Sequence, residues 1–258
     1  MFGPGVMAPV PLHAEGSSAT AVPKFWARAD LVVDGSDISG LTLELLPALS
    51  ISGEVVFEGT ARRPADLSRL QIVANPVLQP YPGFSPAESA HAGADHAGRF
   101  TIAGVFPGTY RLGTGTDGWS LKSVMADDRD VLDFPLEITR TDVTGILITL
   151  TDRVAEITGT VVDSRGDPAS DYSVVLFAAD HRYWTPGSRR MRLTRVDAGG
   201  RFTFRGMPAG EYRLAPLLDY DTGDWSAPAV LQGLESVSTP LWLGEGEKRT
   251  VSLRVRGE

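Results

Sequence analysis

Short runs in which apolar and polar residues alternate, separated by Gly and Pro, make up most of this sequence. In one run the apolar positions are Phe100 and Ile102, and in the next they are Tyr110 and Leu112. Strand side chains point alternately to opposite faces of a sheet, so each pair is expected on a single face. No long segment carries apolar residues at helical spacing. The pattern predicts an all-β protein built from short strands and tight turns.

The pattern repeats with a period of about 105 residues, which indicates repeated structural units. Residues 98–112 recur as 200–214, and residues 51–56 recur as 157–162. Each copy therefore carries an opening strand and a later pair of strands joined by a turn that contains Gly and Pro. A third element is present three times, at residues 41–45, 146–150 and 251–255.

This third element is expected to be the last strand of each repeated unit, and its positions set the expected domain boundaries. Residues 1–50 are expected to be the C-terminal remnant of a preceding β-module together with a flexible N-terminal segment. Two complete β-sandwiches are predicted over residues 51–150 and 154–258, because a chain of 258 residues has room for two cores. The connection at 151–153 is short and lacks Gly and Ser, which predicts restricted motion between the sandwiches.

Two local motifs add detail to each copy. Gly-x-Tyr ends the turn at Tyr110 and Tyr212 and is similar to the tyrosine corner of Greek-key sandwiches, where the hydroxyl bonds back to upstream backbone. Residues 163–168 (Asp-Ser-Arg-Gly-Asp-Pro) favour a turn that leads to a strand over 173–177. The residues expected in the core are Val55, Phe100, Ile102, Tyr110, Leu112, Val161, Val175, Phe202, Phe204, Tyr212 and Leu214.

The motifs of the second copy together resemble one known family. They lie at residues 157–163, 166–168, 174–176, 197–202 and 207–214. This series resembles the carboxypeptidase regulatory-like domain, and the first copy matches it over 51–56 and 98–112 but with an expanded turn. The resemblance implies tandem prealbumin-like (transthyretin-like, Ig-like Greek-key) β-sandwiches, a fold grouped also with starch-binding domains. It further implies a bacterial multi-module protein located outside the cytoplasm, in the periplasm or secreted.

Composition and charge exclude several classes of partner. A net charge of −8 and a pI near 5.1 argue against binding to nucleic acid or to anionic membranes. The absence of Cys excludes disulfides, thiolate nucleophiles and Cys-bound zinc. No apolar run is long enough to span a bilayer. The first ten residues lack the features of a signal peptide, so either the protein stays inside the cell or its export signal lies upstream.

Two segments carry possible metal ligands, and neither completes a site. His91, Asp95 and His96 lie close in sequence in a Gly- and Ala-rich stretch without an obvious further ligand. Residues 219–224 begin like a calcium loop but have Gly at the fifth position and no Glu at the twelfth. No metal and no cofactor is therefore predicted.

The segment 181–190 has the most unusual composition, with His, Tyr, Trp and three Arg. Amphipathic aromatic residues beside Arg stack on sugars or anchor protein interfaces. On this basis Arg182, Tyr183, Trp184 and Trp225 are the candidate contacts for a carbohydrate or a partner. The alternative is that Trp184 packs beneath a loop with its N–H bonded to backbone.

No motif nominates a catalytic site. A Gly-x-Ser-x-Gly elbow is missing, and no Gly-rich phosphate loop opens a helix. We therefore expect a non-enzymatic structural or interaction module of a larger extracytoplasmic protein, whose partners are the other domains of that longer chain, with a glycan or a protein as a further partner. The two alternatives are a carbohydrate-binding module and an accessory domain of a peptidase encoded in the same longer chain.

Overall fold

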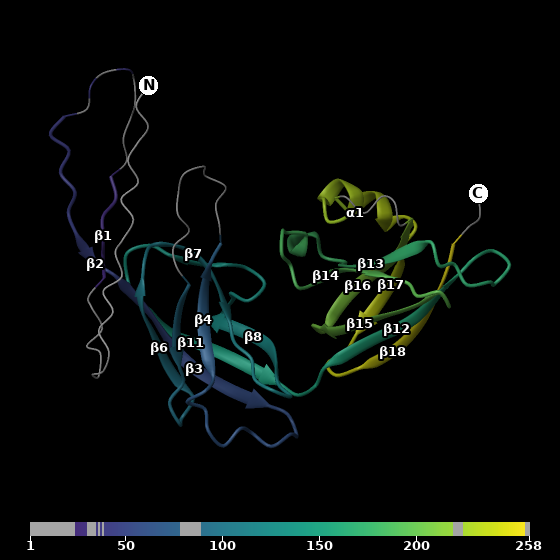
Figure 1. Ribbon diagram of the computed structural model, residues 1–258, viewed down its shortest axis with the longest axis horizontal. Coiled ribbons are helices and arrows are strands. Elements are labelled where there is room, and N and C mark those ends of the chain that lie inside the picture. The colour runs from purple at the N-terminus through teal and green to yellow at the C-terminus, as the bar shows by residue number, and fades with distance from the viewer. Residues whose placement is uncertain are drawn as a thin grey trace. The chain divides into compact units, whose positions relative to one another are not determined.

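The computed structural model describes residues 24–29, 35, 37, 39–77, 89–218 and 224–255 (Figure 1). The chain divides into two compact units, Met1–Ala48 and Leu49–Glu258. In the first unit, β1 (Phe25–Trp26) pairs antiparallel with β2 (Leu46–Pro47). The indole N–H of Trp26 donates to the carbonyl of Pro47 at 3.1 Å.

Residues 41–45 do not form a strand, so the expected closing strand at this position is wrong. Leu41, Leu43 and Leu45 are 51%, 51% and 68% exposed. The two later copies of the element each pair in parallel with the opening strand of their own sandwich. Among the residues described here, no such strand precedes Leu41. Among the described residues no neighbouring strand accepts its hydrogen bonds, and the alternating segment stays solvent-exposed.

The second unit begins with a sandwich of two sheets. Its strands are β3 (Leu49–Glu58), β4 (Gln71–Pro76), β5 (Ala90–Gly93), β6 (Arg99–Val105), β7 (Gly108–Gly113), β8 (Ser120–Ala126), β9 (Arg129–Asp130), β10 (Leu136–Ile138) and β11 (Val143–Thr151). One sheet has the order β10-β7-β4-β5 and the other has β6-β3-β11-β8-β9. The β3–β11 pair is parallel, whereas β8 pairs antiparallel with β11.

A second sandwich follows with the same topology. It consists of β12 (Ala155–Val162), β13 (Tyr172–Ala178), the 3-10 helix η1 (His181–Tyr183), β14 (Met191–Arg195), β15 (Arg201–Met207), β16 (Gly210–Leu218), α1 (Pro228–Glu235), β17 (Thr239–Leu243) and β18 (Lys248–Arg254). Its sheets have the orders β15-β12-β18 and β14-β13-β16-β17, and β12 and β18 are again parallel. The fold is therefore all-β with tandem prealbumin-like sandwiches, which confirms the predicted fold class.

The two sandwiches differ at one edge. In the first, β8 and β9 extend the sheet beyond β11. In the second, the chain after β16 forms α1 instead, and β18 is the last strand of its sheet in the described part of the chain. Leu231 of α1 is fully buried in a small apolar cluster with Phe177 and Trp184, which covers the outer face of β13. This face explains why β13 is buried almost throughout instead of alternating.

Every residue predicted for the core is buried, and none is more than 4% exposed. The two main clusters belong to one sandwich each, and Val175 lies in the small cluster beneath α1. Both tyrosine corners are present. The hydroxyl of Tyr110 donates to the Phe106 carbonyl at 2.9 Å, and that of Tyr212 donates to the Pro208 carbonyl at 2.8 Å. Among the described residues, no helix has the length and apolar character needed to cross a membrane.

Candidate functional site

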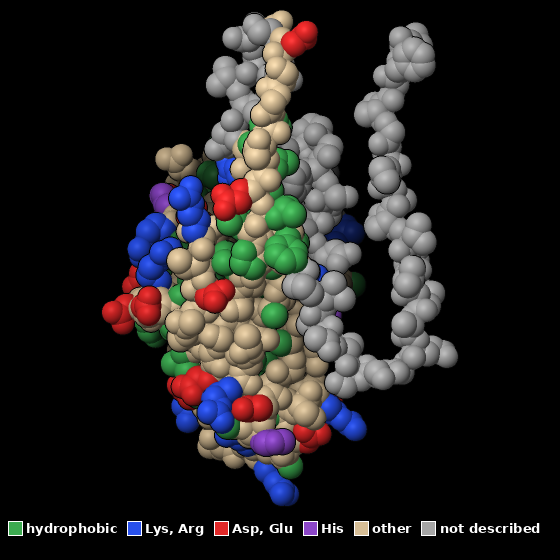
Figure 2. Space-filling view, turned by 90° about the vertical axis from the view of Figure 1, so that its left-hand side faces the viewer, with side chains coloured by type: hydrophobic (Ala, Val, Ile, Leu, Met, Phe, Trp, Pro, Cys, Tyr) green, Lys and Arg blue, Asp and Glu red, His purple; other side chains and the backbone are tan. Residues whose placement is uncertain are grey.

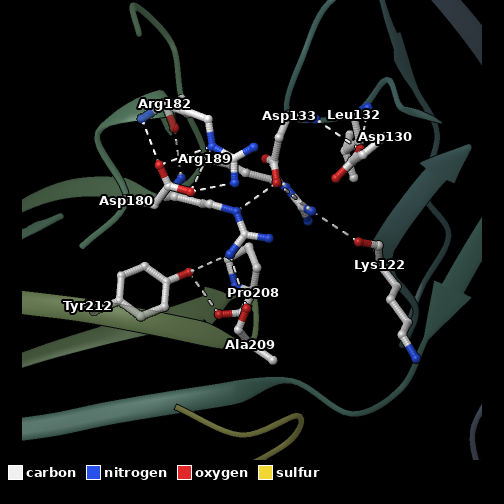
Figure 3. Close-up of polar contacts among 12 residues, drawn as sticks. Lys122, Asp130, Leu132, Asp133, Asp180, Arg182, Arg189, Pro208, Ala209 and Tyr212 are labelled. Carbon is white, nitrogen blue, oxygen red and sulfur yellow. Dashed lines mark hydrogen bonds and ion pairs between the residues drawn. The ribbon is translucent and has the colours of Figure 1, made fainter. Parts of the chain in front are cut away.

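A buried carboxylate, Asp133, lies where the two sandwiches meet (Figure 3). It follows β9 in the first sandwich, and its side chain is only 1% exposed. The Asp130 carboxylate shapes this turn, because it accepts hydrogen bonds from the backbone N–H of Leu132 at 2.8 Å and of Asp133 at 3.3 Å. Arg111 donates to the carbonyls of Leu132 and Asp133 at 3.5 and 3.4 Å. The position of Asp133 is thus fixed by its own sandwich.

Two consecutive arginines of the second sandwich bind this carboxylate. Arg189 donates from Nε to Oδ1 at 2.7 Å and from Nη2 to Oδ2 at 3.3 Å. Arg190 donates from Nε to Oδ2 at 2.6 Å. Both arginines lie directly before β14, and their side chains are 22% and 14% exposed. Charge-assisted bonds of this kind, with one arginine bound through two nitrogens, are strong and directional.

Arg189 also binds backbone of the first sandwich. Its Nη1 donates to the Leu121 carbonyl at 3.2 Å, and its Nη2 donates to the Lys122 carbonyl at 3.1 Å. Both carbonyls belong to β8, a strand that has no counterpart among the described residues of the second sandwich. The guanidinium of Arg189 is therefore held by a carboxylate and two carbonyls of the neighbouring sandwich.

Arg190 links the same carboxylate to the tyrosine corner of its own sandwich. Its Nη1 donates to the Ala209 carbonyl at 3.0 Å and approaches the Tyr212 hydroxyl at 3.5 Å. The guanidinium lies 4.6 Å from the ring centre of Tyr183. The Tyr183 ring in turn stacks on Phe134 of the first sandwich, with centres 5.3 Å apart. An apolar contact thus lies beside the ionic one.

The protonation of this cluster follows from burial and charge. Burial by itself would raise the pKa of Asp133, but the hydrogen bonds and charges of Arg189 and Arg190 outweigh it and hold that pKa below its ordinary value. Burial would likewise lower the pKa of Arg190, and Asp133 raises it overall. Burial raises the pKa of Tyr212 to about 12. At neutral pH the Asp133 carboxylate and the Arg190 guanidinium are therefore charged.

A second ionic contact joins the sandwiches at a different point. Lys122 of β8 contacts Glu58 of its own sandwich and, at 3.1 Å, Glu245 from the turn before β18. The hydrogen bond to Glu58 is the largest cause of the raised pKa of Lys122. Glu245 also accepts from the Thr151 hydroxyl at 3.4 Å. In the connection itself, Asp152 accepts hydrogen bonds from the backbone N–H groups of residues 60 and 61.

Residues 156–216 match the family model of the carboxypeptidase regulatory-like domain. This match lies within the second sandwich. The match ends within β16, so the arginines of the cluster and the tyrosine corner lie inside it. No curated protein matches this chain.

Several solved structures resemble the chain at low similarity. The GBS52 minor pilin of Streptococcus agalactiae is 12% identical, with 81% of this chain and 95% of that chain covered and a TM-score of 0.31. A streptococcal ancillary pilin is 14% identical, with 82% and 63% covered and a TM-score of 0.33. The Bacillus anthracis TIE protein is 10% identical, with a TM-score of 0.29, and the match covers 86% of this chain but only 39% of that protein. Similarity at this level does not identify a function.

The four residues predicted to contact a ligand have different environments, and Trp184 and Trp225 belong to the same apolar cluster. In the second sandwich Trp184 is 7% exposed, and its indole N–H donates to the Ala178 carbonyl at 2.8 Å. Its position is that of a packed residue, and it is not available for stacking on a sugar. Tyr183 contacts Phe134 and Arg190, as described above. Arg182 is exposed and binds Asp180 at 2.7 Å, and Trp225 is half-buried beside the α1 cluster.

The remaining sequence candidates take other places. His91 lies in β5 opposite Val73, and His96 lies in the following turn. Across the described parts of the chain, no three His, Asp or Glu side chains converge as a metal site would require. The calcium-like segment falls mainly on residues 219–223, which lie outside the described residues.

Sequence reasoning missed Asp133 as a site residue. It is 56 residues from Arg189 and belongs to no motif, so nothing in the local pattern marks it. The Arg189-Arg190 pair was visible as part of an unusual segment, but its partner was not. The arrangement holds two domains together through satisfied charges, and within this cluster no side chain is placed as a nucleophile beside a base.

Proposed function

We propose that this chain is a non-catalytic structural module that holds two sandwiches in a fixed relation, as a rigid spacer within a larger extracytoplasmic protein. The observation that carries the proposal is the Asp133 carboxylate, buried between the sandwiches and bound by Arg189 and Arg190. Its physical consequence is orientation, because a carboxylate bound by two guanidinium groups tolerates little rotation. An ordinary flexible linkage would have no need of such a group.

Two contact regions support this restraint. The ionic cluster at Asp133 and the adjacent Tyr183–Phe134 stack form one region, and the Lys122–Glu245 pair forms the other, from different segments of each sandwich. A single contact allows rotation about itself, whereas contacts at several points oppose it. The connection at residues 152–154 adds to the effect, since Asp152 is tied to backbone of the first sandwich.

The wider setting rests on the family resemblance. Carboxypeptidase regulatory-like domains accompany other domains in longer chains, so other domains of the same protein are the proposed partners. The extracytoplasmic location and the domain boundaries at residues 51–150 and 154–258 are part of the same proposal. The cluster contains no side chains arranged for chemistry, which favours a structural role over an enzymatic one.

Backbone ¹⁵N relaxation in solution tests the proposal. We expect residues of both sandwiches to report one rotational correlation time in the unmodified chain. Replacing Asp133 by Ala should split it into two shorter values, because each sandwich then tumbles partly on its own. Asp128→Asn, an exposed change in the turn between β8 and β9, is the matched control and should leave the single value intact. Two distinct correlation times in the unmodified chain would refute the proposal.

A further inference from the structure

In the part of the chain that the structure describes, the outer edge of β18 has no strand beside it, whereas its counterpart β11 does. In the first sandwich, β11 is flanked by β3 on one side and by β8 on the other. The β8 pairing is antiparallel, with Ile146 opposite Ala126 and Ile148 opposite Val124. In the second sandwich β12 occupies the inner side of β18, and no described strand occupies the outer side. Backbone groups along such an edge are available to pair with an added strand.

The residues of β18 define what an added strand must offer. Leu253 is buried and Val251 half-buried on the core face, and Val255 directly after the strand is 7% exposed. On the other face Lys248 and Arg254 are exposed. A complementary strand therefore carries apolar residues at alternate positions toward the core and an acid on its outer face.

Residues 40–45 of this chain have that pattern. Leu41, Leu43 and Leu45 alternate with Thr42 and Glu44, and all three leucines are more than half exposed. The space-filling view shows hydrophobic side chains open to solvent on the face of the first unit turned toward the viewer (Figure 2). In the two other copies of this repeated element the same alternation forms a paired strand. The segment therefore has the alternation typical of a strand, but it pairs with no described strand.

We propose that residues 40–45 of one copy of this chain add to the outer edge of β18 of a second copy as an antiparallel strand. With Leu43 opposite Leu253, the other two leucines face Val251 and Val255. The added strand then occupies the place that β8 occupies in the first sandwich. In this register Glu44 lies on the outer face, diagonal to Arg254, so the charges are complementary.

Pairing of two β18 edges is disfavoured by the same charges. An antiparallel two-fold pairing centred on Val251 places Lys248 of each copy opposite Arg254 of the other. Like charges directly opposite each other are destabilising in a sheet. The contact between different segments is heterologous, and each copy both donates and accepts a strand. Association is therefore expected to proceed beyond a dimer.

Sedimentation velocity of the full chain over a dilution series tests the proposal. A strand of this length buries less surface than a standard stable interface, so association should be weak and should grow with concentration. Leu43→Asp should weaken it at least about tenfold, because a buried leucine is replaced by a charge. Val237→Asp is the matched control, since Val237 is 65% exposed and lies outside the proposed contact. Both positions are exposed, so both variants should keep the thermal unfolding of the unmodified chain.

A charge exchange tests the position of the strand. Glu44→Arg alone and Arg254→Glu alone should each weaken association, by about two- to fivefold, and the two changes together in one chain should restore it. A monomer at all concentrations would overturn the proposal. So would association that Leu43→Asp leaves unchanged. Asp133→Ala should not alter association, so a failure here is distinct from a failure of the rigid-spacer proposal.

Discussion

Replacement of Asp133 by Ala removes the one carboxylate that both arginines share. Arg189 keeps two carbonyl acceptors on β8, and Arg190 keeps the Ala209 carbonyl. Both guanidinium groups nevertheless lose their counter-charge in a place where their side chains are mostly buried. The substitution should therefore destabilise the junction much more than a surface change does.

The magnitude follows from the burial of the three groups. Breaking a buried ion pair by removal of one partner costs about 3–5 kcal/mol. The arginines retain 22% and 14% exposure and several acceptors, so we expect the lower end, about 3 kcal/mol. For a folded unit of this size each kcal/mol shifts the melting temperature by about 2–4 °C, which gives a decrease of roughly 6–12 °C.

Differential scanning calorimetry is the suitable assay, because it also reports cooperativity. The unmodified chain should show one transition for the coupled sandwiches, whereas Asp133→Ala should show two. Asp128→Asn should behave as the unmodified chain, and Asp133→Asn should fall between, since it keeps the shape but not the charge. A single transition for Asp133→Ala within about 2 °C of the unmodified chain would refute the assigned role.

The same cluster predicts that the stability of the folded chain decreases at acidic pH. The pKa of Asp133 is lower in the folded chain than its ordinary value of 3.8. A depressed pKa stabilises the folded state fully above the unfolded value, and this stabilisation is lost as the pH falls through the folded value. The difference in melting temperature between the unmodified chain and Asp133→Ala should thus stay constant from neutral pH down to the ordinary value. Below that pH it should shrink, whereas a difference that shrinks near neutrality would contradict the assignment.

Three further predictions concern the sandwiches themselves. Tyr212→Phe should cost about 1 kcal/mol through loss of the bond to the Pro208 carbonyl. It should also remove the loss of stability expected between pH 10.0 and about 12, because the raised pKa of this tyrosine favours the folded state only while the hydroxyl stays protonated. In thermal melts Trp184→Ala should cost about 3–5 kcal/mol, whereas Trp242→Ala, at a residue that is 58% exposed, should stay within about 0.5 kcal/mol. A fragment of residues 154–258 should fold alone and give dispersed amide NMR spectra, and a collapsed spectrum would count against the proposed boundary.

The strands and their core residues could be predicted because a half-buried strand requires apolar and polar residues to alternate, and this alternation is visible within a few residues of sequence. Alternation places Phe202 and Phe204 on one face wherever the strand pairs, and both residues are buried. The Gly-x-Tyr motif likewise carries its own partner, a carbonyl four residues upstream. Because these motifs occur twice at matching spacing, the sequence predicted two sandwiches of the same kind.

Other features depend on contacts that no local pattern encodes. Alternation predicted a strand at residues 41–45, but a strand also needs a neighbour, and pattern alone does not supply one. The helix α1 is short, and Leu231 anchors it through tertiary burial more than through a long amphipathic repeat. Trp184 shows the ambiguity of composition, since the same residue types serve a binding surface or a packed loop.

The two sandwiches share their strand order, so what distinguishes them lies in the segments between shared strands. The β8–β9 hairpin of the first sandwich provides the carbonyls that Arg189 binds and leads into the turn that carries Asp133. In the second sandwich α1 follows the corresponding strand, and no described strand pairs with the outer edge of β18. This difference in connection gives the first sandwich the groups that bind the second sandwich of the same chain. In our proposal it also leaves the second sandwich an edge that binds another copy. Transplanting residues 118–133 into the second sandwich would close the edge of β18, and by the same logic it should abolish association between copies.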